Sequence, residues 1–171
     1  MAQEPPSAVL SLIGQPRYEV IADNVVNADN IRAMCAAVEN TNSAYWSQES
    51  AVELHGAVFA PASMLSTWAR HELWSPGGGY SVKPLQLHFD LKELFGFPAA
   101  IVSSFESVFY TPAMLGDKVR SWQILQSVSV EKKTRLGTGR FWVIEMQYYN
   151  QCDEPLGVDS FNCFGYRRCI S

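Results

Sequence analysis

The sequence is poor in the side chains that build common metal and redox sites. It has three histidines and four cysteines among 171 residues. The cysteines form no C-x-x-C pair, so the spacing typical of zinc sites and dithiol redox centres is missing. We interpret them as reduced structural thiols, and we expect no metal or organic cofactor. They are Cys35, Cys152, Cys163 and Cys169.

Long apolar runs are also missing. No stretch of the chain reaches the roughly 18 consecutive apolar residues of a transmembrane helix. The N-terminal segment MAQEPPSAVLSLIG lacks a basic region followed by a long apolar run, which is the pattern of a secretory signal. We therefore expect a cytoplasmic protein that does not use a membrane.

Clustered basic charge is scarce. The formal net charge is -4 and the pI is near 5.3, which argues against nucleic acid as a partner, because phosphate binding relies on grouped Lys and Arg. The longest basic groups are KKTR at 132–135 and the pair Arg167 and Arg168. We interpret both as solvated charges of a hairpin and of the terminal region.

Apolar side chains are plentiful enough for one core. The chain is 47% hydrophobic and 18% charged, and its length suits one domain with a substantial core rather than two. We predict a flexible N-terminal arm over residues 1–15, where Pro5 and Pro6 lie, and a single domain over residues 16–171.

The first half of the chain has helical periodicity. Apolar residues at i, i+3, i+4 and i+7 predict an amphipathic helix over residues 28–39, capped by Asn27 or Asp29. A turn of helix is expected near 49–54. A second long helix is predicted over 62–74, after Pro61 and before the segment SPGGG.

The second half alternates polar and apolar residues. The alternation predicts strands over 101–110, 118–131, 139–150 and 156–167. Turn signals at 112–117, 136–139 and 150–155 separate them. Helices followed by an antiparallel sheet indicate an α+β fold.

The order of these segments resembles the hot-dog fold and, within it, the MaoC-like enoyl-CoA hydratases. FESVFYTPAMLGDKV is similar to their strand, Pro-turn and Gly-Asp segment, and TRLGTGRFWVIEMQYYNQCDEPLG to their long hairpin with a Y-x-N-Q-x-x-E turn. The resemblance covers most of residues 20–168, apart from an insertion at 75–97. It implies a single hot-dog fold, with an antiparallel sheet wrapped around a central helix that we assign to 62–74.

The hydratase motif of that family is altered here. Active members carry D-x-N-P-x-H, an Ala six residues after the His, and A-x-G-M at the start of the central helix. The matching segments read NTNSAY at 40–45, Ala51 and APASM at 60–64. Asn40 therefore stands in place of the Asp and Tyr45 in place of the His, while Asn42 is kept.

These two replacements remove the expected acid and base. Hydration of a 2-enoyl-CoA needs one group to take a proton from water and another to protonate the α-carbon. Asn40 is not a base at neutral pH, and a phenol with a pKa of about 10 replaces an imidazole poorly. We therefore expect no catalytic residue in this chain. His71 and His88 lie outside the motif, and we interpret His55 as a surface histidine whose role needs a test.

The segments WARHELWSP, FGFPAAIVSSFESVFY and NCFGYRR resemble the non-catalytic subunits of heteromeric MaoC-like hydratases that act on bulky acyl-CoAs, including those of bacterial steroid side-chain breakdown. The resemblance implies a catalytic hot-dog partner with an intact motif, which pairs edge to edge with this chain. Its interface is expected at the exposed sheet edge and at 54–64. Such subunits often continue into a domain that binds an aldolase, so an aldolase is a further expected partner through a domain that residues 1–171 do not contain.

Expected acyl-CoA-binding residues form three groups. The first is an apolar wall, for which packing in the core is the alternative interpretation. The second is the start of the central helix, whose amide groups suit an anion, and the third is a set of cations for the CoA phosphates. The groups are Trp46, Met64, Trp68, Phe105 and Phe109; Ala62 and Ser63, with Asn42 from the motif; and Arg70, Lys132 and Arg135.

Two other functions fit the altered motif. A hot-dog thioesterase would need a carboxylate that attacks or activates water, and Glu49, Glu53 and Glu72 are the candidates. A non-enzymatic acyl-binding or scaffold protein would need no such group. Release of free thiol from acyl-CoA separates the first from the second.

Overall fold

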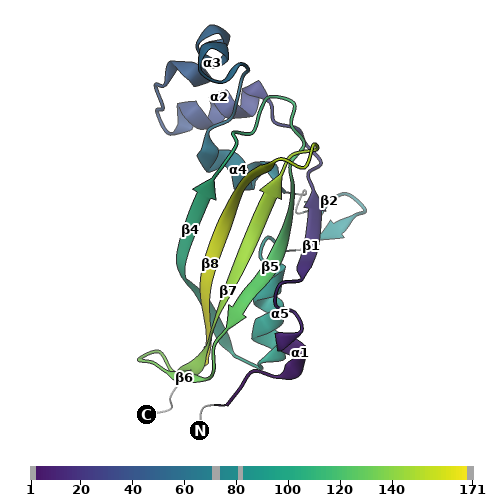
Figure 1. The fold of residues 1–171 in the computed structure, drawn as a ribbon, viewed down its shortest axis with the longest axis vertical. Coiled ribbons are helices and arrows are strands. Elements are labelled where there is room, and N and C mark those ends of the chain that lie inside the picture. The colour runs from purple at the N-terminus through teal and green to yellow at the C-terminus, as the bar shows by residue number, and fades with distance from the viewer. Residues whose placement is uncertain (1–2, 71–73, 81–82, 169–171) are drawn as a thin grey trace.

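The computed structural model describes residues 3–70, 74–80 and 83–168. At its centre is a six-stranded antiparallel sheet in which the main strands follow the order β1-β5-β7-β8-β4, with β6 paired to β7 (Figure 1). A two-residue pair, β2 with β3, lies apart from it. The strands are β1 Pro16–Ile21, β2 Trp74–Ser75, β3 Gly79–Tyr80, β4 Ala99–Phe109, β5 Arg120–Val128, β6 Lys132–Lys133, β7 Thr138–Tyr149 and β8 Pro155–Arg167.

All four predicted strands are present. They coincide with β4, β5, β7 and β8 to within a few residues, and their antiparallel pairing confirms the α+β class. The predictions did not include β1, which pairs with β5 and forms the far edge of the sheet. Its sequence PRYEVI begins with a proline, and proline suits an edge strand because it has no N–H for the ladder.

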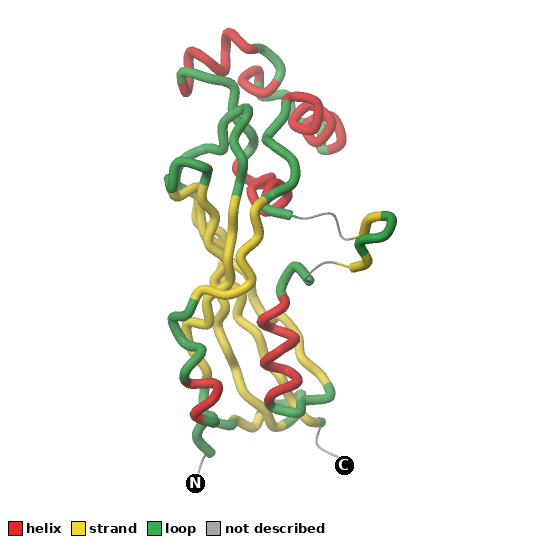
Figure 2. The backbone as a smooth tube through the Cα atoms, turned by 90° about the vertical axis from the view of Figure 1, so that its right-hand side faces the viewer, coloured by secondary structure: helices red, strands yellow, loops and turns green. Residues whose placement is uncertain are grey.

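The helix α5, Gln86–Leu94, lies along the strands (Figure 2). It buries Leu87 and Leu91 against a cluster that includes Leu125, Trp142 and Ile144 of the sheet. These leucines are four residues apart and so share one face of the helix. The insertion expected at 75–97 therefore contains a helix that contributes to the core.

The predicted helix over 62–74 is wrong in its length. Residues Ala62–Met64 form the 3₁₀ turn η2, Leu65–Trp68 form α4, and Ala69 leaves the helical region at φ -94° and ψ 39°. Ser66 and Thr67 are weak helix formers because their side chains compete for backbone groups. Residues 71–73 lie outside the described chain, and residue 74 begins β2. Trp68 is only 4% exposed, so this segment is enclosed as expected.

Three N-terminal helical segments stand beyond one end of the sheet, next to α4 (Figure 1). They are α2 Ala28–Ala37, η1 Ser43–Tyr45 and α3 Gln48–His55. The helix predicted over 28–39 is confirmed, and its cap is Asn27, whose Oδ1 accepts the Asn30 N–H at 2.9 Å. The turn predicted near 49–54 is a longer helix, because Ser47 caps its start and Gly56 its end.

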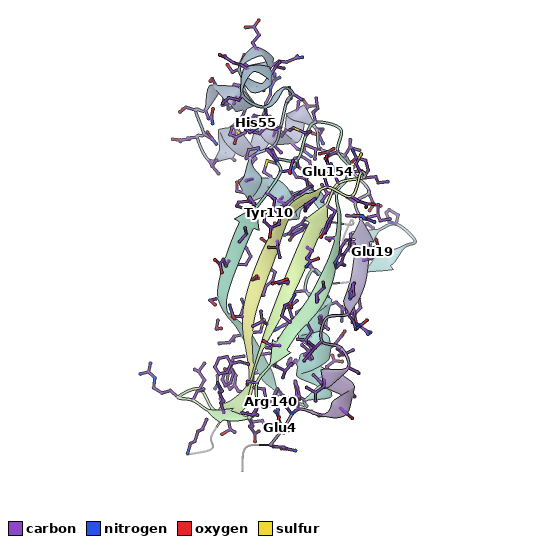
Figure 3. All side chains as sticks on the ribbon, viewed as in Figure 1. Glu4, Glu19, His55, Tyr110, Arg140 and Glu154 are labelled. Atoms are coloured by element: carbon purple, nitrogen blue, oxygen red, sulfur yellow. The ribbon has the colours of Figure 1, made fainter. Side chains whose placement is uncertain are left out.

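The described part of the predicted arm packs on the domain. Residues Ser7–Leu10 form α1, and Val9 is buried in the same cluster as Leu87. Arg140 donates from Nη2 to the carbonyl oxygen of Glu4 at 3.1 Å, and Figure 3 shows these residues side by side at the end of the sheet opposite His55. The division of the chain at residue 15 stays a prediction.

Cys35, Cys152 and Cys163 are free thiols, and Cys169 lies outside this part of the chain. In the described segments, no helix is long and apolar enough to cross a bilayer.

Candidate functional site

The altered motif forms a loop held by its own side chains. Asn40 Oδ1 accepts the Asn42 N–H at 3.0 Å, and Asn42 Oδ1 accepts the Ala44 N–H at 3.1 Å. Trp46 Nε1 donates to the carbonyl oxygen of Asn40 at 2.7 Å. Asn40, Asn42 and Trp46 line neither of the two cavities described below. Their polar groups shape the loop.

Tyr45 projects from this loop into a cavity of about 200 Å³. Its ring meets the ring of Phe59 edge-on, with centroids 5.3 Å apart, and His55 meets the same ring at 4.2 Å. Burial and the nearby Cys35 raise the pKa of the Tyr45 phenol. The residue in the position of the hydratase histidine is therefore a neutral hydrogen-bonding group at physiological pH.

Two other ionisable side chains among the described residues line this cavity, His55 and Tyr110. His55 lines it from the end of α3, above Tyr110 at the end of β4 (Figure 3). Glu49 and Glu53 are exposed on α3 and line neither cavity, while Glu72 and His71 lie outside the described residues. His88 is buried on α5 against Trp142, in a different cluster.

A larger cavity of about 410 Å³ lies on the other side of α4. Leu65 lines the smaller cavity, whereas Ser66 and Ala69 line the larger one. The larger cavity extends to Leu85, just before α5 begins at Gln86. It lies between the end of α4 and the segment that leads into α5. Its floor is the inner face of the sheet, with Phe105, Met146 and Phe161 as apolar residues and Gln123, Tyr148 and Asp159 as polar ones.

The structure divides the predicted binding residues. Phe105 and Arg70 line the larger cavity, and Ala62 and Phe109 line the smaller one. Met64 and Trp68 line neither and pack in the core, as the alternative interpretation held. Ser63 is exposed away from both cavities.

Two of the cations predicted for CoA phosphates lie elsewhere. Lys132 is in β6 and Arg135 in the turn that follows, and both are exposed. This hairpin lies at the end of the sheet opposite α2 and α3 (Figure 1). The structure therefore brings neither residue to a cavity.

One polar cluster was missed in the sequence. Asp159 accepts hydrogen bonds from Ser107 Oγ at 2.5 Å and from the Tyr148 hydroxyl at 2.7 Å. Burial and the adjacent carboxylate raise the pKa of Tyr148 far above its ordinary value, so this phenol stays protonated. The available signal was a single acidic residue within the otherwise uncharged run LGVDSFNCF.

A second polar group lies beside the larger cavity, which its members Tyr18 and Gln123 line. The Tyr18 hydroxyl donates to Asp90, which also accepts from Gln86 Nε2 at 2.8 Å. Gln123 Oε1 accepts the Leu87 N–H at 3.0 Å and so satisfies a donor in the first turn of α5. These bonds fix α5 to β1 and β5 beside the cavity.

The sequence matches the model of a known protein family over most of its length. Residues 11–157 match the model of the FAS1-like, dehydratase domain region. The chain belongs to this family. A probable enoyl-CoA hydratase alpha subunit from Thermomonospora curvata is 28% identical over 162 residues, which cover 91% of this chain and 48% of that protein. The chain thus spans about half the length of this relative.

Several solved structures share the fold, MaoC-like dehydratases among them. A chain of the ChsH1-ChsH2 complex from Mycobacterium tuberculosis matches with a TM-score of 0.79 at 22% identity, covering 96% of this chain and 92% of that one. HadBC, a 3R-hydroxyacyl-ACP dehydratase complex from the same organism, gives 0.55 at 17%, with coverages of 86% and 95%. The MaoC-like dehydratase from Rhodospirillum rubrum gives 0.55 at 14%, with 90% and 93%. The predicted hot-dog fold is confirmed.

Proposed function

We propose that this chain is the non-catalytic, acyl-pocket-forming subunit of a heteromeric enoyl-CoA hydratase that acts on a bulky acyl-CoA. One observation carries the proposal. The two positions of the hydratase acid-base pair hold an amide committed to its own loop, Asn40, and a phenol with a raised pKa, Tyr45.

The chemistry explains why these groups do not suffice. Water adds to the β-carbon of an enoyl thioester as it loses a proton, and the α-carbon gains one. The amide of Asn40 does not accept that proton at neutral pH, and the Tyr45 phenol stays protonated. The acid and base of the proposed enzyme therefore belong to the partner chain.

The cavities support an acyl-binding role. Ligand sites commonly measure about 300–1,000 Å³ and are mostly apolar with a few polar groups, and the larger cavity fits this description at about 410 Å³. It adjoins the smaller cavity across α4, on the side away from Tyr45. We propose that the larger cavity holds a wide acyl group, such as a steroid side chain with its rings.

The edge of the sheet supports a hot-dog partner. Among the described strands, β4 pairs only with β8, so its other edge is open. Phe105 is 57% exposed, and Phe109 on the same face is also exposed. Open edges are usually paired or covered, and a specific interface buries more than about 1,000 Å². The ChsH1-ChsH2 and HadBC structures are both complexes, which supports a two-chain enzyme.

Of the three cations predicted for the CoA phosphates, Arg70 lies at a cavity, but at the one proposed for the acyl group. Its role in phosphate binding stays a prediction. Four other expectations stay predictions: phosphate binding by Lys132 and Arg135, anion binding by the amides of Ala62 and Ser63, the aldolase partner and the cytoplasmic location.

Co-expression tests the proposal. The chain is purified alone and together with a hot-dog protein of its source organism that keeps D-x-N-P-x-H, sought first among the neighbouring genes. Each preparation is incubated with 2-enoyl-CoAs. We expect hydration by the pair and none by the chain alone. Hydration by the chain alone at an ordinary enzyme rate would contradict the proposal and make His55 the first suspect. Release of free thiol by the chain alone would indicate a thioesterase instead, and acyl-CoA binding without turnover in either preparation a scaffold.

A further inference from the structure

The floor of the larger cavity contains a buried carboxylate that forms no salt bridge with any described residue. Asp159 is 5% exposed and lines the cavity. Burying a charge is costly unless it is paired or well hydrogen-bonded. In the described part of the chain, Asp159 forms no salt bridge, and its partners are the hydroxyl groups of Ser107 and Tyr148.

These two donors leave acceptor sites on the carboxylate for a group in the cavity. An ionised carboxylate accepts about four hydrogen bonds, and Ser107 and Tyr148 supply two, one to each oxygen. The neighbouring wall is formed by Phe105, Met146 and Phe161. In such apolar surroundings a hydrogen bond is stronger, and a missing one is more costly, than in water. A molecule in the cavity gains by presenting a donor to Asp159.

The charges around the cavity limit what that donor is. Arg70 and Lys83 line the same cavity, so a cationic ligand would meet two like charges. A carbonyl group carries only acceptor lone pairs and would face the oxygens of Asp159 unfavourably. A hydroxyl group is a neutral donor that satisfies both conditions.

We infer that Asp159, held by Ser107 and Tyr148, accepts a hydrogen bond from a hydroxyl group on the bound acyl group. This rests on the proposed function, because it takes the larger cavity as the acyl pocket. The substrate class is accordingly a bulky acyl-CoA that is hydroxylated on its ring system or chain.

Three CoA thioesters with one ring skeleton test the inference. They derive from 5β-cholanic acid, which has no ring oxygen, from cholic acid, which has hydroxyl groups, and from dehydrocholic acid, which has ketones at the same positions. Binding is measured by titration calorimetry on the full chain alone and in complex with its co-purified partner. We expect the cholic thioester to bind at least roughly tenfold more tightly than the dehydrocholic one, as one charge-assisted hydrogen bond provides.

Two substitutions should shift the ratio of the two affinities, that for the cholic thioester over that for the dehydrocholic one, in opposite directions. Asp159→Asn replaces an acceptor oxygen with a donor and should lower the preference for the hydroxyl compound by roughly tenfold. Tyr148→Phe frees an acceptor site on Asp159 and should raise that preference, so it carries the test if the first variant does not fold. Glu106→Gln is the matched control: Glu106 is exposed and points to the opposite face of β4 from Ser107.

The outcomes separate the inference from the proposed function. If all three thioesters bind but neither variant changes the ratio, Asp159 only ties the strands together, and the inference fails while the proposed function stands. If no thioester binds to either preparation, both fail. If Glu106→Gln shifts the ratio as much as Asp159→Asn does, the effect is one of overall charge and the inference fails.

Discussion

The indole nitrogen of Trp46 donates a 2.7 Å hydrogen bond to the carbonyl oxygen of Asn40. Together with the bond from the Asn42 N–H to Asn40 Oδ1, it closes the segment that corresponds to the hydratase motif into a small self-contained loop. Both bonds tie a side chain of the segment to its own backbone. The loop therefore retains the frame of a catalytic segment while its amide side chains serve its own backbone.

Restoring the two motif residues should not restore an enzyme. The double variant Asn40→Asp, Tyr45→His regains an acid and a base, but residue 40 lines neither cavity and its side chain faces the backbone of residue 42. Catalysis needs all groups positioned together. We expect no appreciable hydration of 2-enoyl-CoA by this variant without a partner, measured by loss of enone absorbance. Strong activity would show a hydratase disabled at only two residues.

Tyr148 should contribute to stability through Asp159. Tyr148→Phe keeps the buried ring but leaves one oxygen of a buried carboxylate without its donor. We expect the free energy of unfolding in urea to fall by about 1–3 kcal/mol. Tyr149→Phe, next in the strand and only half-buried, should change it by less than about 0.5 kcal/mol. Equal effects of the two variants would mean that Tyr148 Oη does not hold Asp159 in solution.

His88 should make stability fall in mild acid. Burial, with Lys92 as a lesser cause, lowers the pKa of this histidine below the 6.5 of an exposed one, and Nδ1 has no hydrogen-bond partner within the described residues. Below pH 6.5 the unfolded chain gains a proton that the folded chain does not, so stability is full above that pH and declines below it.

The slope of the unfolding free energy against pH tests this. Between pH 6.5 and the lower pKa of the folded state, His88 contributes at most about 1.4 kcal/mol per pH unit. We expect His88→Leu to flatten the decline and His55→Gln, which removes an exposed histidine, to leave it in place. A slope that is unchanged in His88→Leu would assign the decline to other groups.

A charge on the open sheet edge should weaken the complex. Val108 of β4 is 43% exposed, and Leu136 in the turn at the other end of the sheet is 49% exposed. Val108→Lys should reduce the affinity for the hot-dog partner at least roughly tenfold, because burying an unpaired ammonium in an interface is costly. Leu136→Lys, with similar exposure, should not, as measured by surface plasmon resonance. The reverse pattern would place the interface at the hairpin end.

The sheet could be predicted from the sequence because its signal is local. Alternating residues such as Trp142, Ile144 and Tyr148 are enough to mark a strand with one buried face. The helices were harder. The apolar pattern of 62–74 predicts a long helix, but the weak helix formers Ser66 and Thr67 lie within it and the helix ends at Trp68. The helix α5 falls in the segment interpreted as an insertion, although Leu87 and Leu91 have helical spacing.

The site could be predicted only where the motif is continuous. Asn40 and Tyr45 were found because the hydratase motif occupies one segment of the chain. Asp159 was missed because its partners come from two other strands, and pairing in the sheet brings Ser107 opposite Asp159. The sequence alone does not show which strands are neighbours. Met64 and Trp68 were predicted to line a pocket because they are large and apolar, but they pack in the core. Residue type alone does not separate the two locations.

In the proposed enzyme, the acid and the base lie on the partner chain. The most direct measurement is the hydration rate of the complex after the Asp and His of the partner's motif are replaced by Asn and Gln, with this chain unchanged. Loss of a general acid-base pair typically lowers the rate by about 10²-fold to 10⁴-fold or more, and we expect a loss of at least that size. A complex that still hydrates 2-enoyl-CoA at close to its original rate would place the catalytic groups on this chain and contradict the account.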